Sequence, residues 1–374
     1  MEELRLDHEE VVAMEQCPDA TEHHPRAEDQ PQTEKEDSEK AELLKRIDHL
    51  ERELQFRNEM TPERLNFSNI PNFFQYNTGF TYEQFNSLCT IFSIPNSETA
   101  PPRMAPLVYR KVDQQITLMP LRQQLLLVLM KLRQNFDLKE LAFKFNICIQ
   151  SVSTLVNSWI DFMFTTLGRL PMWPHRDVLT QNMPKKYRSQ FPTTFAILDC
   201  TEIRIQTPSS LALQSETYSN YKSTNTLKSL IIVDPRGSVM FCSTLFTGCI
   251  SDKEIVKKCG ILPLLTNLIE HGYLKQGDGL MADKGFLIQQ EVEALGLKLN
   301  LPPFVRSNRQ MPACDVSKTK TIAHHRIHVE RAIAKIKKFK IVSGRIPNAR
   351  LHNINEIWYV VSTLSNFQPM ILKD

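Results

Sequence analysis

The sequence predicts a mixed α/β domain that follows a small all-α domain and an acidic N-terminal segment. Residues 171–374 carry short apolar runs of strand length, which alternate with stretches of helical periodicity. Residues 65–170 carry helical patterns alone, and residues 1–64 begin with a stretch that is poor in large apolar side chains. The order of several strands, a helix, a strand, a helix, a strand and C-terminal helices is typical of a central sheet flanked by helices.

The charge of the chain divides at the first of these boundaries. The 374 residues have a formal net charge of only +3. Residues 1–64 hold 9 Lys/Arg and 20 Asp/Glu, a net charge of −11, whereas residues 65–374 hold 36 and 22, a net charge of +14. A basic folded part suits a polyanionic partner, although excess lysine also serves solubility alone.

The composition argues against a membrane or secreted protein. No apolar run approaches the ~18 residues of a membrane span, and the start MEELRLDHEE is unlike a signal peptide. The eight cysteines form no C-x-x-C pair, and several lie inside apolar runs. We therefore expect reduced, buried thiols in an intracellular protein.

The acidic segment has two parts. Residues 1–40 are rich in Glu, Asp, Gln, Pro and His, and we expect them to be disordered. A short amphipathic helix follows over residues 43–56, and two heptads are too few to establish a coiled coil. This helix is the expected site of a homodimer or of a contact with a partner protein. Its apolar residues are spaced 4-3-4 along the chain: Leu43, Ile47, Leu50 and Leu54.

The predicted helical domain contains a helix-turn-helix pattern. A capping box at 81–84 begins one helix, and residues 121–136 are apolar nearly all round, as in a buried helix. Residues 137–160 then predict two packed helices, with Asn146 in the left-handed conformation of a tight turn. The start of the second helix carries small polar groups suited to phosphates and base edges, although plain surface explains them equally well. These groups are Gln150, Ser151, Ser153 and Thr154.

The α/β part is predicted from residue 171 onward. An irregular connector with three prolines spans residues 173–194. A hairpin turns around Asp-Pro-Arg-Gly at 234–237, and a capping box at 251–254 begins a helix that runs to about residue 269. A long helix begins near Thr319. Strands are expected over residues 195–199, 202–206, 227–246 (as the hairpin), 279–283 and 297–304.

Three carboxylates lie at the ends of these elements or on the last helix. Asp199 ends an apolar strand, Asp283 follows a short strand, and Glu330 lies on the long helix. Each has an ordinary structural explanation: a strand terminator, a helix N-cap and a partner of Arg326. Alone, each of those explanations is the better one. Together, two acids leaving adjacent strands and a third on a helix meet the needs of a pair of hard divalent cations such as Mg²⁺.

The order of motifs from residue 195 onward resembles the DDE-type transposase domain of the Harbinger and related superfamily. The resemblance also extends over residues 73–170, which match the helix-turn-helix region that precedes this domain, and it covers about four fifths of the chain. The motifs are specific through their order and spacing. They are DCTEI (199–203), TYSNYKSTNTLKSLI (217–231), PRGSVMF (235–241), GCISDKEI (248–255), MADKGF (281–286), LPPF (301–304), RIHVERAIAKIK (326–337) and NFQP (366–369).

The resemblance implies a ribonuclease H-like fold and a two-metal reaction. The acidic triad of the family falls on Asp199, Asp283 and Glu330, which would be catalytic residues and ligands of Mg²⁺ or Mn²⁺. Some family members carry an N-terminal THAP zinc finger. Residues 1–64 contain a single cysteine, Cys17, so we expect no such finger in this segment and only modest sequence preference for DNA.

Further residues in the matched motifs are candidates for contacts with DNA or metal. Asp252 matches an acidic position of the family, but its place in the 251–254 capping box is the simpler explanation. His324 and His328 have a spacing that zinc enzymes use, and His325 in place of glutamate argues against a zinc-protease site. The basic residues predicted to contact DNA phosphates, with generic basic surface as the alternative, are Lys222, Lys228, Lys284, Arg326, Arg331 and Lys337.

The sequence therefore predicts a metal-dependent enzyme that cleaves DNA phosphodiester bonds and is located in the nucleus. The reaction would be an in-line displacement, either hydrolysis alone or hydrolysis with strand transfer. The alternative is a domesticated, non-catalytic DNA-binding protein. Intact acids at all three positions count against that alternative, because a binding protein gains nothing from negative charge that faces DNA.

Overall fold

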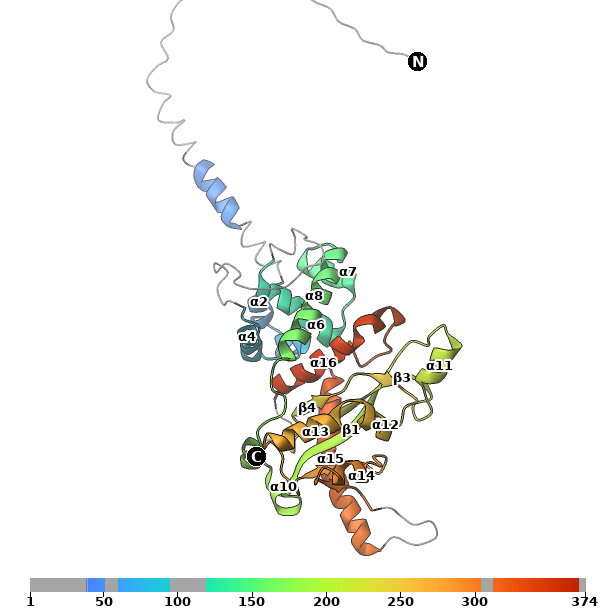
Figure 1. Cartoon of the computed structure of the whole chain (residues 1–374). Coiled ribbons are helices and arrows are strands. Elements are labelled where there is room, and N and C mark those ends of the chain that lie inside the picture. Colours follow the sequence, from blue (N-terminus) through green and yellow to red (C-terminus); the bar gives the residue numbers. More distant parts are fainter. Residues whose placement is uncertain (1–37, 39, 51–59, 95–118, 304–311, 370–374) are drawn as a thin grey trace, which may run out of the picture. The chain divides into compact units, whose positions relative to one another are not determined.

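The computed structural model describes residues 38, 40–50, 60–94, 119–303 and 312–369. The contacts divide the chain into one unit of residues 1–58 and another of residues 59–374 (Figure 1). In the first unit, residues 40–50 are helical, and Leu43, Ile47 and Leu50 are exposed. The predicted helix is therefore present over residues 40–50, and its predicted continuation to residue 56 lies outside the described residues.

The second unit begins with a group of helices. Thr81 caps one of them through a complete capping box with Gln84, as predicted, and Phe85 and Leu88 of that helix are buried. The helix that was expected to be buried has every residue from Gln123 to Leu132 out of solvent. The helices are α2 (Pro62–Asn66), α3 (Phe73–Thr78), α4 (Tyr82–Ile91), α6 (Leu121–Gln134), α7 (Leu138–Phe145) and α8 (Ile149–Leu167).

Helices α7 and α8 form the predicted helix-turn-helix pair. Asp137 caps α7 by accepting a hydrogen bond from the Lys139 amide at 2.8 Å. Asn146 ends α7 with φ 50° and ψ 46°, the left-handed conformation that asparagine tolerates better than most residues. Helix α8 then runs on to Leu167, seven residues beyond the predicted end.

The first predicted domain boundary falls inside a packed helix. Residue 64 lies within α2, whose Pro62 and Leu65 are buried. Glu63 accepts a hydrogen bond from the Tyr82 hydroxyl at 2.9 Å and forms an ion pair with Arg122 at 3.4 Å. Residues 60–64 therefore belong with the helices that follow them.

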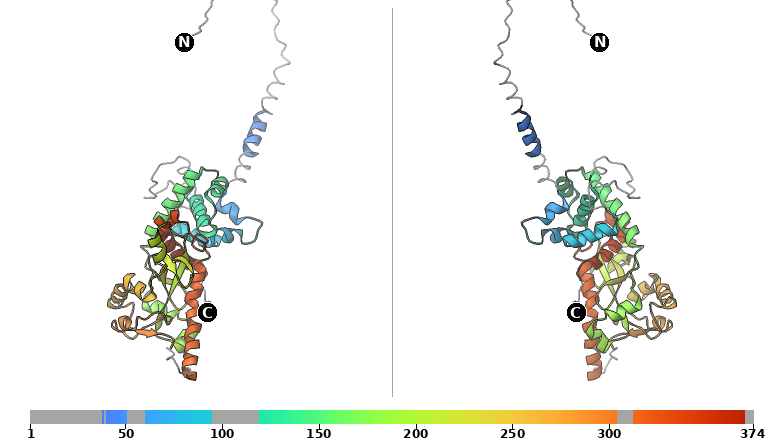
Figure 2. Two further views of the ribbon diagram at one scale, coloured as in Figure 1. Left: turned by 90° about the vertical axis from the view of Figure 1, so that its right-hand side faces the viewer. Right: turned by 90° about the vertical axis from the view of Figure 1, so that its left-hand side faces the viewer.

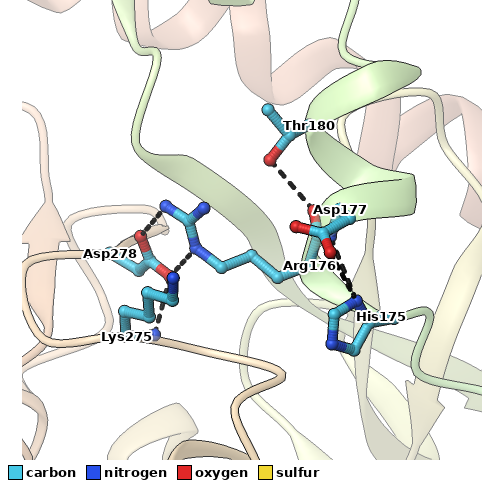
Figure 3. A network of polar contacts seen from close by, with 6 residues as sticks. All are labelled: His175, Arg176, Asp177, Thr180, Lys275 and Asp278. Carbon is cyan, nitrogen blue, oxygen red and sulfur yellow. Dashed lines mark hydrogen bonds and ion pairs between the residues drawn. The ribbon is translucent and has the colours of Figure 1, made fainter.

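The connector between the helices and the sheet is more regular than predicted. It contains α9 (Arg176–Gln181) and α10 (Lys185–Gln190), and Pro184 is the N-cap of α10. Arg176 donates two hydrogen bonds of 3.0 Å to the buried carboxylate of Asp278, which also accepts from the Lys275 amide (Figure 3). This bidentate pair ties the connector to the loop that enters the sheet.

The second unit is built around a mixed sheet, as predicted. Its order is β2-β3-β1-β6-β7, and β4 and β5 both pair with β3. Strand β1 runs antiparallel to β3 and parallel to β6, and β6 runs parallel to β7. The strands are β1 (Thr194–Arg204), β2 (Tyr218–Ser219), β3 (Thr224–Val233), β4 (Val239–Cys242), β5 (Phe246–Thr247), β6 (Gly279–Met281) and β7 (Lys298–Asn300).

The sheet corrects one prediction and confirms another. The two strands expected at 195–199 and 202–206 are one continuous strand, β1, because β3 pairs with it from Ile197 to Arg204. The hairpin is present, since β3 turns into β4 around Asp234, whose carboxylate accepts hydrogen bonds from the amides of Arg236 and Ser238.

Helices cover both faces of the sheet. Figure 2 shows α12 and α13 (gold) on one side and α15 (orange) on the other. The helix predicted over 251–269 is divided at Gly260, whose φ of 81° favours glycine. Helix α15 begins six residues before the predicted Thr319. The elements are α11 (Leu211–Thr217), α12 (Asp252–Lys258), α13 (Ile261–Glu270), α14 (Gln289–Glu293), α15 (Ala313–Ile336), η1 (Asn348–Asn353), α16 (Ile354–Leu364) and η2 (Ser365–Phe367).

The helical part and the sheet share one hydrophobic core. Helix α16 joins them: the Trp358 indole donates to the Ser229 hydroxyl of β3 at 2.9 Å, and the Tyr359 ring contacts Phe164 of α8 edge-on at 5.3 Å. Among the described residues, no helix is long and apolar enough to span a membrane, and the seven described cysteines are free thiols.

Candidate active site

The register of the sheet brings Asp199 and Asp283 together. The last pair between the parallel strands β1 and β6 is Ile197 with Met281, and each acid lies two residues farther along its strand. Strand β6 ends there, whereas β1 continues, so Asp199 lies in the middle of β1 and pairs with Ile231 of β3. The prediction that Asp199 ends a strand is therefore wrong.

Arg326 of α15 bridges the two acids. Its Nη2 lies 3.7 Å from Asp199 Oδ1, and its Nη1 lies 3.1 Å from Asp283 Oδ1. The arginine side chain is only 10% exposed, whereas the side chains of Asp199 and Asp283 are 22% and 52% exposed. Arg326 was predicted to contact phosphates or to pair with Glu330. Instead, its charge is satisfied by the two aspartates.

Glu330 approaches the same place from one turn farther along α15. Residues four apart lie on one face of a helix, so Glu330 and Arg326 share a side of α15. Burial raises the pKa of Asp199 to about 6; the Arg326 charge opposes this rise, and the negative charges of Glu330 and Asp252 add to it. Asp199 and Asp283 thus share the Arg326 side chain, and the charge of Glu330 acts on Asp199.

Asp252 is a fourth carboxylate at this edge, and Lys228 neutralises it. The Lys228 Nζ atom lies 2.6 Å from Asp252 Oδ1. A Cβ atom added to Gly285 would lie 3.1 Å from Asp252 Oδ2, which places this carboxylate beside the segment that follows Asp283. The helix-cap explanation also holds, since Ser251 caps α12 by accepting from the Glu254 amide. Lys228, predicted to contact phosphate, is therefore already paired within the protein.

Lys337 extends the same face of α15 toward the far end of β1. Its Nζ donates to the Glu202 carbonyl oxygen at 2.8 Å, and burial lowers its pKa. The Glu202 carboxylate accepts a hydrogen bond from the Thr226 hydroxyl at 2.8 Å. Lys337 thus holds the end of α15 against β1. This structural role differs from the contact with phosphate that was predicted for Lys337.

The remaining predicted DNA contacts differ in exposure. Lys222, Arg331 and Gln150 are exposed, and Lys284 and Ser153 are half-buried. Ser151 is fully buried, because its position in the first turn of α8 faces the core and its amide donates to Cys148 Sγ. Ser151 is thus not available to DNA, and its prediction as a contact residue is wrong.

The chemistry of the acids fits a hard divalent cation, because carboxylate oxygens are the ligands that Mg²⁺ prefers. Two of these acids, Asp199 and Asp283, are bridged by Arg326. Among the described residues, no three His, Cys, Asp or Glu side chains are gathered closely enough to hold a metal ion. His328 is buried, and this burial lowers its pKa to about 4.

Two family models match the chain. Residues 198–366 match the model of the DDE superfamily endonuclease, and residues 117–169 match that of the helix-turn-helix of DDE superfamily endonuclease. The first match runs from β1 to η2 and contains Asp199, Asp283 and Glu330. The second covers α6, α7 and α8.

The chain is also similar to part of a curated protein. The chain is 30% identical over 98 residues to a Xenopus laevis protein named "Putative nuclease HARBI1". This alignment spans 26% of the present chain and 26% of the length of that relative.

Proposed function

Because the chain belongs to the DDE superfamily of endonucleases, and to its Harbinger type, we propose that it cleaves DNA phosphodiester bonds in a reaction that depends on a divalent metal. The observation that carries this proposal is the convergence of Asp199 and Asp283 at the end of β6, with α15 bringing Glu330 to the same side. Proteins of this superfamily generally use divalent metals, and the helix-turn-helix family implies DNA binding.

Asp199, Asp283 and Glu330 are the residues that would hold Mg²⁺ or Mn²⁺. When bound, such ions lower the pKa of an attacking water and stabilise the charge of the leaving oxygen. The carboxylates contribute the negative charge that makes the site selective for cations, and without a cation they would repel a phosphate. The same chemistry serves hydrolysis alone or strand transfer by a DNA 3′-hydroxyl.

Arg326 controls the charge of this site before a metal binds. It neutralises part of the charge of Asp199 and Asp283 and keeps the two carboxylates from repelling each other. A cation held by these acids would compete with this guanidinium for their carboxylate oxygens, and the ion pairs of Arg326 would weaken. Arg326 would then be free to approach a DNA phosphate, which is the contact predicted for it.

The exposed and half-buried polar residues would give DNA a path across the protein. Lys222 and Lys284, near the acids in the sequence motifs, and Arg331 on α15 would bind phosphates of the cleaved region. Gln150 and Ser153 at the start of α8 would contact the duplex through the helix-turn-helix. Because DNA is the proposed substrate, we also place the protein in the nucleus, which a fluorescent fusion would test.

One observation favours the alternative of a non-catalytic DNA-binding protein derived from a transposase. Arg326 already neutralises two of the three acids, as a protein without metal chemistry would require. In that case divalent metals would bind weakly and Arg326 would stay in place. The two proposals predict different results with Mg²⁺, because only the enzyme would cleave DNA when the ion is added.

Nicking of a supercoiled plasmid that carries candidate terminal repeats tests the proposal. We expect nicking that rises with Mg²⁺ concentration and stops when the ion is chelated. Glu270→Gln, which removes an exposed carboxylate at the end of α13, is the matched control and should nick at the wild-type rate. DNA binding without nicking at any Mg²⁺ or Mn²⁺ concentration would support the binding protein instead.

A further inference from the structure

A cationic site lies on another side of α15, apart from the three acids. A cavity of about 940 Å³ opens between α3 and α15. Four cations line it: Arg133 from the end of α6 and Arg331, Lys335 and Lys338 from α15 and its C-terminal end. Two rings of α3, Phe73 and Tyr76, form another part of its wall. No carboxylate is among its lining residues.

The cations of this cavity lack counter-ions within the described part of the protein. None of the four forms an ion pair there, and Arg133 Nη1 is buried without a hydrogen-bond partner. Lys335 donates only to the Gln368 carbonyl oxygen, at 3.3 Å. Burial, together with the nearby charge of Lys338, lowers the pKa of Lys335 to about 8. An anion in the cavity would relieve this uncompensated positive charge.

The rings give the cavity a flat apolar surface beside the cations. Phe73 and Tyr76 stack with 6.5 Å between their centroids and 10° between their planes. Tyr76 is 59% exposed, and Lys340 Nζ lies 5.9 Å from the centre of its ring. Cations next to exposed aromatic rings are the combination that binds unpaired nucleotides, whose phosphates need charge and whose bases stack on rings.

The position of the cavity connects it with the acids. An α-helix turns by about 100° per residue, so the side chains of Arg331 and Ala334 point roughly a quarter turn away from the face that carries Arg326 and Glu330. Arg331 directly follows Glu330 in the chain. Since the helix rises about 1.5 Å per residue, Lys335 lies about 7.5 Å along the axis from Glu330, and Lys338 follows just beyond the end of α15.

We propose that this cavity binds an unpaired segment of the DNA substrate, with phosphates on Lys335, Lys338 and Arg133 and a base against Tyr76. The choice of DNA rests on the proposed function, because the same cations would also attract an acidic peptide. The exposed Tyr76 ring, stacked on the half-buried Phe73, and the shared helix favour a nucleic-acid strand. Duplex DNA would still be bound mainly by the helix-turn-helix.

Binding of a fluorescently labelled oligothymidylate to the full chain tests this site. Removing a phosphate contact lowers the slope of log K against log salt by about 0.7 for single strands, so Lys335→Gln with Lys338→Gln should lower it by about 1.4. Tyr76→Ala should weaken binding about tenfold through lost stacking. Lys298→Gln on the edge strand β7 removes one exposed positive charge, as Lys338→Gln alone does, and should change neither quantity.

The outcomes separate this inference from the proposed function. Pocket variants that melt like the wild type and bind oligothymidylate with unchanged slope and affinity would overturn it, even if the protein nicks plasmids. Lys338→Gln alone, at an exposed position, keeps the test valid should the double variant unfold.

Weakened oligothymidylate binding in a protein that never nicks DNA would support the site and contradict the nuclease. Poly-glutamate that displaces the oligonucleotide equally well, with Tyr76→Ala silent, would point to an acidic peptide and overturn the proposal.

Discussion

The buried carboxylate of Asp199 has an energetic cost that its proposed function would explain. Its pKa is raised to about 6, first by burial, whereas an unfolded aspartate titrates near 3.8. The folded state therefore holds the proton more tightly between these two values. The contribution of Asp199 to the free energy of unfolding is largest below about pH 4 and declines as the pH rises through about 6.

Replacing Asp199 by asparagine should thus stabilise the metal-free protein. We expect the free energy of unfolding at pH 7 to rise by an amount on the order of 2 kcal/mol, and the decline between about pH 4 and 6 to diminish. Urea denaturation in the presence of a chelator measures both effects. Asp161→Asn, at an exposed position of α8, is the control and should have little effect. A destabilised Asp199→Asn protein would instead indicate a purely structural aspartate.

At the scale of elements, Gly248 fixes the approach of the β5–α12 loop to β3. A Cβ atom at this position would lie 2.2 Å from Thr226 Oγ1 and 2.6 Å from the Thr217 carbonyl oxygen. Gly248→Ala should therefore lower the free energy of unfolding by about 1–3 kcal/mol through overpacking. It should also disturb the hydrogen bond from Thr226 to Glu202.

A second glycine provides the control for that prediction. A Cβ atom at Gly344 would meet no atom within 4 Å, so Gly344→Ala should leave the stability nearly unchanged. Thermal unfolding of both variants measures the difference. Equal stability of the two variants would contradict the close approach at Gly248.

Local signals in the sequence predicted the helices better than the strands. The capping box at Thr81 and the left-handed Asn146 are decided within a few residues, and both were predicted. Helix α10 was missed, although Pro184 stands where a proline commonly precedes a helix. The single long β1 was missed because its continuity depends on pairing with β3, which is far away in the sequence.

The types of the site residues were predictable, but their pairings were not. Asp199, Asp283 and Glu330 stood out as acids in apolar or helical contexts. The bridge from Arg326 to two strands depends on the parallel register of β1 and β6 and on where α15 crosses them. The pairing of Lys228 with Asp252 likewise joins β3 to α12, which no spacing in the sequence indicates.

At the scale of the whole molecule, the division of the chain predicts where it can be shortened. Removing residues 1–58 should leave the melting temperature of the rest unchanged, because these residues form a separate unit. Removing residues 1–64 should lower it, because the cut destroys α2 and removes Glu63 from Tyr82 and Arg122. Equal melting temperatures would contradict the boundary. Light scattering on the shorter deletion would also show whether the exposed helix of residues 40–50 mediates self-association.

The basic charge of residues 65–374 predicts salt-dependent binding to duplex DNA. Each phosphate contact lowers log K by about 0.9 per unit of log salt, so Lys222→Gln and Lys284→Gln should each reduce the slope by about that amount. Lys228→Gln should not reduce it, because Asp252 already neutralises this lysine. Fluorescence anisotropy at several salt concentrations gives the slopes. Equal reductions of the slope in all three variants would mean that the lysines act only through the overall positive charge and not through individual phosphate contacts.

The most direct test of the account is the Mg²⁺-dependent cleavage rate of Asp283→Asn. This variant keeps the size of the side chain, and the position is half exposed, so the fold should survive. If Asp283 acts with Asp199 and Glu330 in one site, cleavage should fall by orders of magnitude while duplex binding persists or tightens, because a negative charge near the phosphates is gone. Asp199→Asn and Glu330→Gln should behave in the same way. Folded variants that cut DNA at the wild-type rate would contradict the shared site.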